Sequence, residues 1–277
     1  KGKVVTRGLI DLHTHVYSGV NANGVDPDIG GVRAAVTTMV DAGSSGCDNF
    51  GGFPAHILPN TATEIICFLH ICRTGLNTTP DIFSPDSINL DKTIEVISDN
   101  KGVISGVKAR MVSPALEIMG MEMPRLAKRA AVEAGVPLMV HIGDTMKRYD
   151  ANVIRELLPI LDKGDIVTHY FTANPGGVLD SNSKLVPEAK EAHDRGVWLD
   201  TAHGQMNFSF EVGQKILDQG VVPHCISTDL TVPGRANTVH SMTEMMTRFL
   251  AMGFTFDQVV TMSTENPAKA AGVADRL

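Results

Sequence analysis

Short apolar runs recur at roughly even intervals along the whole chain, and patterns typical of amphipathic helices lie between many of them. The runs are rich in β-branched and aliphatic residues, which is typical of strands buried on both faces of a parallel sheet. The eight runs are residues 8–13, 36–41, 64–71, 103–110, 137–142, 165–170, 197–201 and 224–229.

One helical pattern illustrates the segments between these runs. Residues 242–250 carry methionine, phenylalanine and leucine at helical spacing, directly after a capping box formed by Ser241 and Glu244. The methionine stripe is interpreted as core. Because strands and helices alternate, and because eight near-equal units favour closure over an open sheet, the sequence predicts an α/β protein with a (β/α)₈ barrel. Residues 1–277 are expected to form this barrel as a single domain.

Loop lengths indicate which end of the predicted barrel carries the site. Segments that lead from a helix into a strand are tight, whereas those that leave the strands are long and rich in Gly, Pro, Asn and Ser. In α/β barrels the active site lies where the strands end and these loops begin. The long segments are residues 16–27, 43–63, 72–90, 171–183 and 230–240.

Composition narrows the function classes. Of the 277 residues, 43% are hydrophobic and 20% are charged, and the formal net charge is -7, which gives no basic stripe for a nucleic acid. No apolar stretch is long enough to span a membrane. The four cysteines form no CxxC pair, so we expect reduced thiols and a cytoplasmic location. The expected partner is a small-molecule substrate. The chain opens without a signal peptide, directly before a strand, so a trimmed N-terminus is considered, and a homo-oligomer is left open.

Metal-competent side chains stand at the ends of several predicted strands. His13 and His15 are two residues apart at the end of the first run, so their side chains should point the same way. The fifth, sixth and eighth runs deliver His141, His169 and Asp229 to the same rim. This convergence predicts a metal site, because imidazole and carboxylate are typical ligands of divalent ions. The remaining histidines are interpreted as core or loop residues: His56, His70, His193, His224 and His240.

Lys108 ends the fourth run, where a protonated ammonium beside two cations would be desolvated and repelled. It could instead point outward to solvent. If it faces inward, we expect a neutral amine that takes up carbon dioxide and becomes a carboxylated lysine, able to bridge two metal ions. With this carbamate, Asp229 and one hydroxide, two divalent ions keep one net positive charge, whereas a protonated lysine would leave three.

The order of these residues resembles the amidohydrolase superfamily in its binuclear metal subtype. The stretches GLIDLHTH and TENPAKAAGV are also similar to it, and HTHVYSG, DAGSSG, GVKARM, HYFTANPGG and HGQMNFSF resemble the D-aminoacylase or deacetylase-like branch. The small β-sandwich usual in the family is expected to be absent or trimmed. The resemblance implies that His13, His15 and Asp229 bind one ion and that His141 and His169 bind the other. Carboxylated Lys108 and a hydroxide would bridge the two ions, which are expected to be Zn²⁺.

The resemblance further implies hydrolysis of an amide or ester bond, with Asp229 as the catalytic proton shuttle. Strand geometry places Arg110 on the same side as Lys108, where it would bind a substrate carboxylate, and His203 and Gly204 are expected to contact the substrate from across the barrel. The substrate would be an N-acyl amino acid or an O-acetyl hydroxy acid. The alternatives are a cyclic amidase such as a dihydroorotase or hydantoinase, a deaminase, a phosphotriesterase, and a barrel without catalytic activity.

Overall fold

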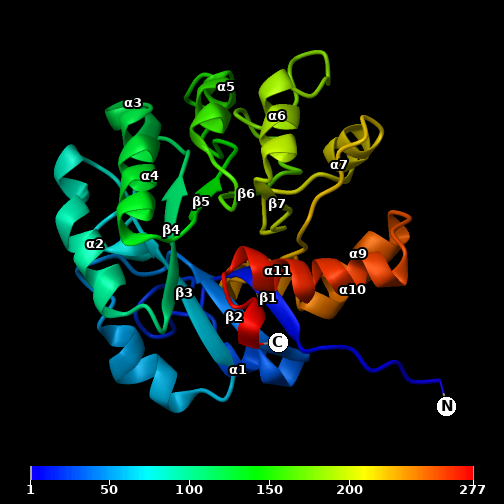
Figure 1. The fold of residues 1–277 in the computed structure, drawn as a ribbon, viewed down its shortest axis with the longest axis horizontal. Helices are drawn as coiled ribbons and strands as arrows, with labels where there is room; N and C mark the ends of the chain where they lie inside the picture. Colours follow the sequence, from blue (N-terminus) through cyan, green and yellow to red (C-terminus); the bar gives the residue numbers. More distant parts are fainter. Residues whose placement is uncertain (1, 277) are drawn as a thin grey trace.

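Seven parallel strands form one curved sheet in the computed structural model, which describes residues 2–276 (Figure 1). Each strand pairs with its neighbours in chain order, as expected for successive βα units. The strands are β1 (Leu9–Thr14), β2 (Val36–Ala42), β3 (Glu64–His70), β4 (Ile104–Arg110), β5 (Leu138–His141), β6 (Ile166–Thr168) and β7 (Trp198–Asp200).

The predicted eighth strand, residues 224–229, joins the two edges of this sheet without forming a regular strand. A parallel bridge connects Cys225 to β7, and another connects Leu230 to β1. Between them, the carboxylate of Asp11 accepts hydrogen bonds from the backbone N–H and the hydroxyl of Thr228, at 3.0 and 2.6 Å. The segment is thus held by isolated bridges, by backbone hydrogen bonds and by this side chain instead of a continuous ladder. The fold is the predicted TIM-type barrel, with seven regular strands in residues 2–276.

Helices cover the outside of the barrel (Figure 1). The α-helices are α1 (Pro27–Gly30), α2 (Leu90–Asp99), α3 (Ala115–Met119), α4 (Glu122–Ala134), α5 (Val153–Leu157), α6 (Pro187–Arg195), α7 (Phe210–Leu217), α8 (Val232–Asn237), α9 (Met242–Ala251), α10 (Phe256–Met262) and α11 (Glu265–Ala270). Short 3₁₀ or π turns occupy Val32–Ala34, Phe53–Ile57, Leu58–Asn60, Gly75–Asn77, Pro85–Ser87, Leu158–Ile160 and Ala274–Arg276. None of the helices within residues 2–276 has the length and apolar character needed to cross a bilayer.

The start of α9 follows the predicted capping pattern with one difference. The Ser241 hydroxyl accepts a hydrogen bond from the Glu244 N–H at 3.3 Å, as a cap should. The Glu244 carboxylate accepts its bond from the His240 N–H, one residue before the cap. Met242, Met245 and Phe249 are buried on this helix and Met246 is half-buried, so these residues are core as predicted, whereas Leu250 at the end of the pattern is exposed.

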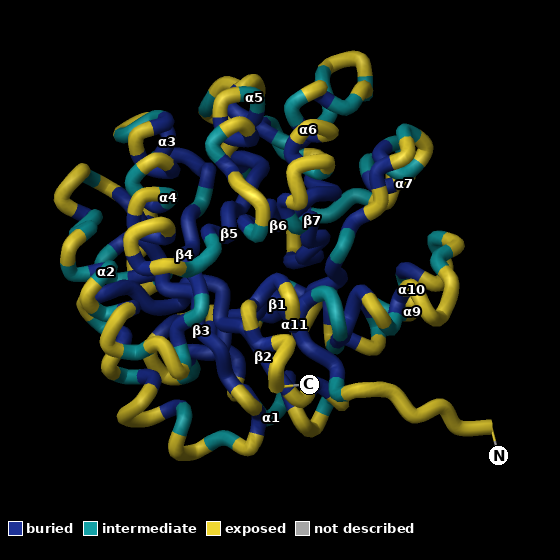
Figure 2. The backbone as a smooth tube through the Cα atoms, viewed as in Figure 1, coloured by how far each residue is buried: buried dark blue, intermediate teal, exposed yellow. Residues whose placement is uncertain are grey.

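Burial follows the layers of the barrel: buried residues run along the strands and exposed ones lie on the outer helix faces (Figure 2). Helix α4 buries a face of small side chains that includes Ala127, Ala130 and Ala131, which lets it pack against α2 and β4. Inside the barrel, Gly106 of β4 leaves room for the Phe68 ring, since a Cβ atom at Gly106 would lie 2.7 Å from that ring. Close packing of this kind holds the strand ends that carry the candidate site.

Candidate metal centre

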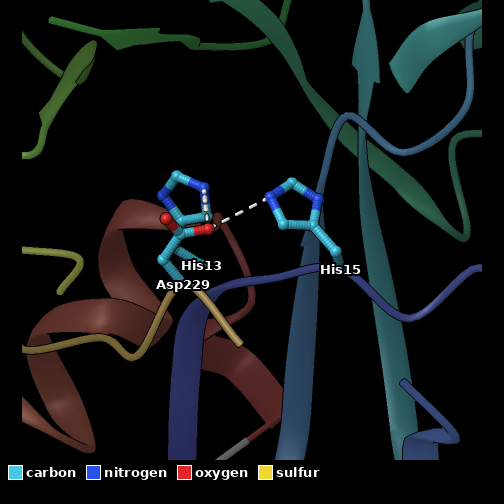
Figure 3. A group of neighbouring side chains, drawn as sticks. All are labelled: His13, His15 and Asp229. Carbon is cyan, nitrogen blue, oxygen red and sulfur yellow. Dashed lines mark ion pairs between the residues drawn. The ribbon is translucent and has the colours of Figure 1, made fainter. Parts of the chain in front are cut away.

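Side chains from the first and last parts of the chain meet at the C-terminal end of the barrel. His13 lies in β1, and His15 follows directly after it. Their Nε2 atoms lie 3.5 and 3.2 Å from Oδ1 of Asp229, so both rings point at one carboxylate (Figure 3). One ligand atom from each of the three residues lies within 4.8 Å of the other two. This group could therefore hold a metal ion.

His141 and His169 lie beside this group. His141 is the last residue of β5, and His169 directly follows β6. Their ring centroids are 4.1 Å apart, and the His169 ring is 4.9 Å from that of His13. The Nε2 atoms of both are buried without a hydrogen-bond partner among the described residues. Buried unpaired nitrogens are costly, and a divalent ion would satisfy them, so this donor set fits a metal centre.

The protein holds the opposite ring nitrogens of three of these histidines. The Nδ1 atoms of His13 and His15 lie 2.9 and 3.1 Å from hydroxyl oxygens, and Nδ1 of His169 donates to the Ala202 carbonyl oxygen at 2.7 Å. A carbonyl oxygen accepts only, so the Nε2 atom of a neutral His169 carries a lone pair. Rings held in this way present Nε2 to the centre of the site.

The electrostatics of the site favour neutral imidazoles. Burial, followed by the nearby Lys108, holds the pKa of His13 well below its usual value, and burial followed by His169 does the same to the pKa of His141. Burial lowers the pKa of His169 to about 4. At neutral pH these rings are uncharged, which is the form that binds metals.

Lys108 faces the interior of the barrel. Its side chain is only 1% exposed, and Nζ lies 3.3 Å from Nε2 of His13 and 3.4 Å from Sδ of Met139. Gly43 makes room for its stem, since a Cβ atom there would lie 2.7 Å from Cγ of Lys108. Burial lowers the pKa of Lys108 to about 7, against the opposing effect of Asp229. A substantial fraction of this amine is therefore neutral near physiological pH.

Asp229 stands on strained backbone in the segment that closes the barrel. Its φ is 51°, a left-handed value that is uncommon outside glycine. His169 and Ala202 also have positive φ, at 67° and 21°, so strain concentrates around the site. Burial alone would raise the pKa of Asp229, but the hydrogen bond with His15 and the nearby His169 lower it below its ordinary value. Its carboxylate is therefore ionised at neutral pH.

A cavity of about 530 Å³ opens above this group. It is built by the loops that follow the strands, as the loop lengths predicted. Polar and apolar residues from several of these loops line the cavity. The candidate site residues His15, His141 and Asp229 also line it. The lining residues are His15, Asn23, Leu76, Thr78, Thr79, Pro80, Asp81, Arg110, Val112, Ser113, Pro114, His141, Thr145, Met146, Arg148, Gln205, Met206, Asn207, Asp229 and Thr231.

Arg110 is the last residue of β4 and is paired in register with His141. Its guanidinium lines the cavity wall and donates to Oδ2 of Asp81 at 3.3 Å. Asp81 is only 3% exposed, so this ion pair is partly desolvated. Asp81 thus holds Arg110 beside the candidate metal centre, and no sequence pattern had identified this aspartate as a site residue.

The ring of His203 is held by Phe208, Gly204 and Arg248. Its ring stacks on Phe208 with centroids 4.4 Å apart, and both of its nitrogens are engaged, Nδ1 with the Gly204 carbonyl oxygen at 2.7 Å and Nε2 with Arg248 at 2.6 Å. Gly204 adjoins Asp229, since a Cβ atom at Gly204 would lie 2.2 Å from Oδ2 of that residue. Gly204 and His203 therefore shape the loop after β7.

His70 is buried, as its interpretation as a core residue expects, and it also lies next to the candidate centre. It is fully buried at the end of β3, in register with Lys108, and its Nδ1 accepts a hydrogen bond from the Cys72 N–H. Its Nε2 lies 3.5 Å from Oδ2 of Asp81. The signal was present in the sequence, because His70 ends its strand as the candidate ligands do. Asp81, inside a long loop, gave no comparable signal.

Together, the barrel and the histidine-rich centre define a class of α/β proteins whose strand ends offer ligands to divalent ions. The chain belongs to the amidohydrolase family, which matches residues 4–277. The predicted family is thus confirmed. Members of this family generally use a metal ion.

Known proteins resemble this chain over most of its length. A protein named deacetylase from Agrobacterium fabrum is 34% identical, and the match covers 97% of this chain and 65% of that protein. The chain thus spans about two thirds of this curated relative. A solved structure titled as a dihydroorotase is 33% identical with a TM-score of 0.86, covering 96% of this chain and 69% of that one. One titled as an adenine deaminase is 27% identical with a TM-score of 0.88, covering 97% and 72%.

Proposed function

We propose that this protein hydrolyses an amide or ester bond in a small acylated acid, such as an N-acyl amino acid or an O-acetyl hydroxy acid. The observation that supports the proposal is the convergence of six side chains beneath the cavity. Two divalent ions, with Zn²⁺ the best match to the donors, would occupy this site. The six residues are His13, His15, Lys108, His141, His169 and Asp229.

The contacts divide these residues into two sets. His13, His15 and Asp229 would hold one ion, and the unpaired Nε2 atoms of His141 and His169 would hold the other. Lys108, whose Nζ lies 3.3 Å from Nε2 of His13, would join the two sets as a carbamate. In that reaction its neutral amine forms a bond to the carbon of carbon dioxide and releases a proton, which leaves a carboxylate on a long stem.

A bound divalent ion supplies Lewis acidity to the scissile carbonyl and lowers the pKa of water. Asp229 performs the proton transfers. Its Oδ1 faces His13 and His15, and its Oδ2 faces Gly204, so one oxygen is directed toward the ligands and the other toward the loop after β7. The ionised carboxylate accepts a proton from the attacking water and passes it to the leaving nitrogen or oxygen.

Arg110 binds the substrate carboxylate in this proposal. Its guanidinium lines the cavity, and Asp81 engages one of its terminal nitrogens, which leaves other N–H groups to bind a planar anion. Gln205, Met206 and Asn207 line the cavity together with Arg110, so His203 and Gly204, which precede them in the loop after β7, would contribute through the shape of that loop. A cavity of about 530 Å³ is adequate for a small acylated acid.

The chain is proposed to act as one barrel domain on a small molecule. We further propose a cytoplasmic location, because Cys47, Cys67, Cys72 and Cys225 are all free and buried. Hydrolysis of a cyclic amide is the second candidate, favoured by the similarity to a structure titled as a dihydroorotase. The inward Lys108 argues against a deaminase with a single ion.

The test compares an acylated acid with its methyl ester in the wild type and in Arg110→Met. We expect the wild type to prefer the free carboxylate and Arg110→Met to lose that preference. Arg148→Met is the matched control, because Arg148 also lines the cavity but lies on an exposed loop. If the wild type shows no preference, or if Arg148 rather than Arg110 governs it, the assignment of Arg110 fails. Turnover of dihydroorotate or hydantoins alone would select the cyclic-amidase alternative.

A further inference from the structure

Two buried side chains, those of Thr168 and Asp200, lead away from the ring of His13. Thr168 is the last residue of β6 and is paired in register with Asp200, the last residue of β7. The Thr168 oxygen lies 2.9 Å from Nδ1 of His13, and its hydroxyl donates to Oδ2 of Asp200 at 2.7 Å. All three residues are at most 1% exposed. Water therefore does not compete for these hydrogen bonds.

The direction of each hydrogen bond follows from the donors available. An ionised Asp200 accepts only, and it also accepts the Ser227 hydroxyl proton, at 2.7 Å to Oδ1. The single hydroxyl proton of Thr168 is therefore directed to Asp200, and its oxygen is left to accept. His13 must supply the proton of the remaining contact, from Nδ1.

We propose that Thr168 and Asp200 are positioning residues that fix His13 as the tautomer with its proton on Nδ1. The lone pair of Nε2 then points to the place where Asp229 and Lys108 meet the ring. The role of this tautomer in metal binding rests on the proposed function. The tautomer itself can be measured without metal.

The other side of the ring is consistent with this assignment. Nζ of Lys108 lies 3.3 Å from Nε2 of His13, and the ammonium form of Lys108 can only donate, which requires an unprotonated Nε2. Thr168 specifies this tautomer, and the ammonium form of Lys108 is compatible with it. Because the hydroxyl and the carboxylate come from two adjacent strands, the register of β6 and β7 sets the orientation of a ligand on β1.

The experiment measures the tautomer of His13 directly in chelator-treated, ¹⁵N-histidine-labelled protein. Long-range ¹H–¹⁵N correlation spectra distinguish the two tautomers, and the His13 signal is the one lost in His13→Gln. We expect the wild type to carry its proton on Nδ1. Thr168→Val removes the acceptor with little change of shape and should populate the Nε2–H tautomer, whereas Thr168→Ser should retain the wild-type spectrum.

A second readout is Zn²⁺ affinity by competition with a chromophoric chelator. Thr168→Val should bind Zn²⁺ about 10–100-fold more weakly, the usual effect of removing the hydrogen-bond partner of a metal ligand. The Zn²⁺ affinity of Thr168→Ser should stay close to that of the wild type. Asp200→Asn frees the Thr168 hydroxyl to donate to His13 and should shift the tautomer in the same direction. This variant tests the proposal independently if Thr168→Val does not fold.

The outcomes separate this inference from the proposed function. An unchanged His13 tautomer and Zn²⁺ affinity in folded Thr168→Val, with only lower thermal stability, would overturn the positioning role. The expected tautomer shift in a protein that neither binds Zn²⁺ nor hydrolyses acylated acids would support the positioning of His13 and contradict the proposed function.

Discussion

A Cβ atom at Gly204 would lie 2.2 Å from Oδ2 of Asp229, so the absence of a side chain at one residue makes room for the carboxylate of the other. Gly204→Ala should therefore displace Asp229, lower turnover at least about 10-fold and destabilise the fold by about 1–3 kcal/mol through overpacking. Turnover on an acylated acid and urea unfolding measure the two effects.

Gly135→Ala is the matched control for this variant. Gly135 also has positive φ, at 72°, but an added Cβ atom there would meet no atom within 4 Å. It should lose stability through backbone strain and keep turnover. Equal losses of turnover in both variants would show that contact with Asp229 is unimportant.

Asp229→Asn is expected to keep the fold and much of the metal while lowering turnover by roughly 10²–10⁴-fold, the usual contribution of a positioned acid–base group. Because the pKa of Asp229 is lowered, its ionised form persists well into acid, and the acidic limb of the wild-type pH–rate profile should lie at low pH. Steady-state kinetics across pH test this, and an asparagine variant with near-normal turnover would exclude the proton-transfer role.

Lys108→Ala should lose most activity and at least one divalent ion, because the proposed bridge between the two ligand sets is the carbamate of this lysine. Short carboxylic acids at high concentration should restore part of the activity by replacing the carbamate. Elemental analysis with turnover measures both effects. Full metal content together with full activity in this variant would refute the bridging lysine.

Asp28 lies outside the candidate site, and its hydrogen bonds predict that the stability of the protein depends on pH. Its carboxylate accepts hydrogen bonds from the hydroxyls of Thr61 and Thr63, at 2.6 and 2.8 Å, and these bonds hold its pKa below the ordinary value of 3.8. A carboxyl with a lowered folded-state pKa stabilises the protein above its unfolded-state pKa, and that contribution is lost as pH falls below about 3.8 toward the folded-state pKa.

Asp28→Asn should therefore lower the free energy of unfolding by about 1 kcal/mol at pH 7, and the difference from wild type should shrink as the pH falls below about 4. Urea unfolding between pH 7 and pH 2.5 measures it. Exposed Asp86 provides a control substitution, Asp86→Asn, that should change stability little. A difference that grows toward acid would contradict the direction of this pKa shift.

Much of the barrel and of the candidate metal centre could be predicted, because both depend on local patterns of apolar and metal-competent residues in the sequence. Apolar runs located the strands, and a period of two placed His13 and His15 on one side. The regular eighth strand was not realised: this segment meets β1 and β7 only at single bridges, and the side chain of Asp11 on β1 bonds Thr228. Nor could spacing reveal that Arg248 engages His203, or that Asp81 holds Arg110. These contacts join residues far apart in sequence.

The most direct test of the account is a metal titration of chelator-stripped protein, followed by turnover of an acylated acid. We expect no activity in the stripped protein and a return of activity on adding Zn²⁺ that saturates near two equivalents per chain, since the two ligand sets around Lys108 would each hold one ion. Full activity in the stripped protein, or Zn²⁺ binding that saturates without any turnover of acylated acids or cyclic amides, would contradict the proposed hydrolytic metal centre.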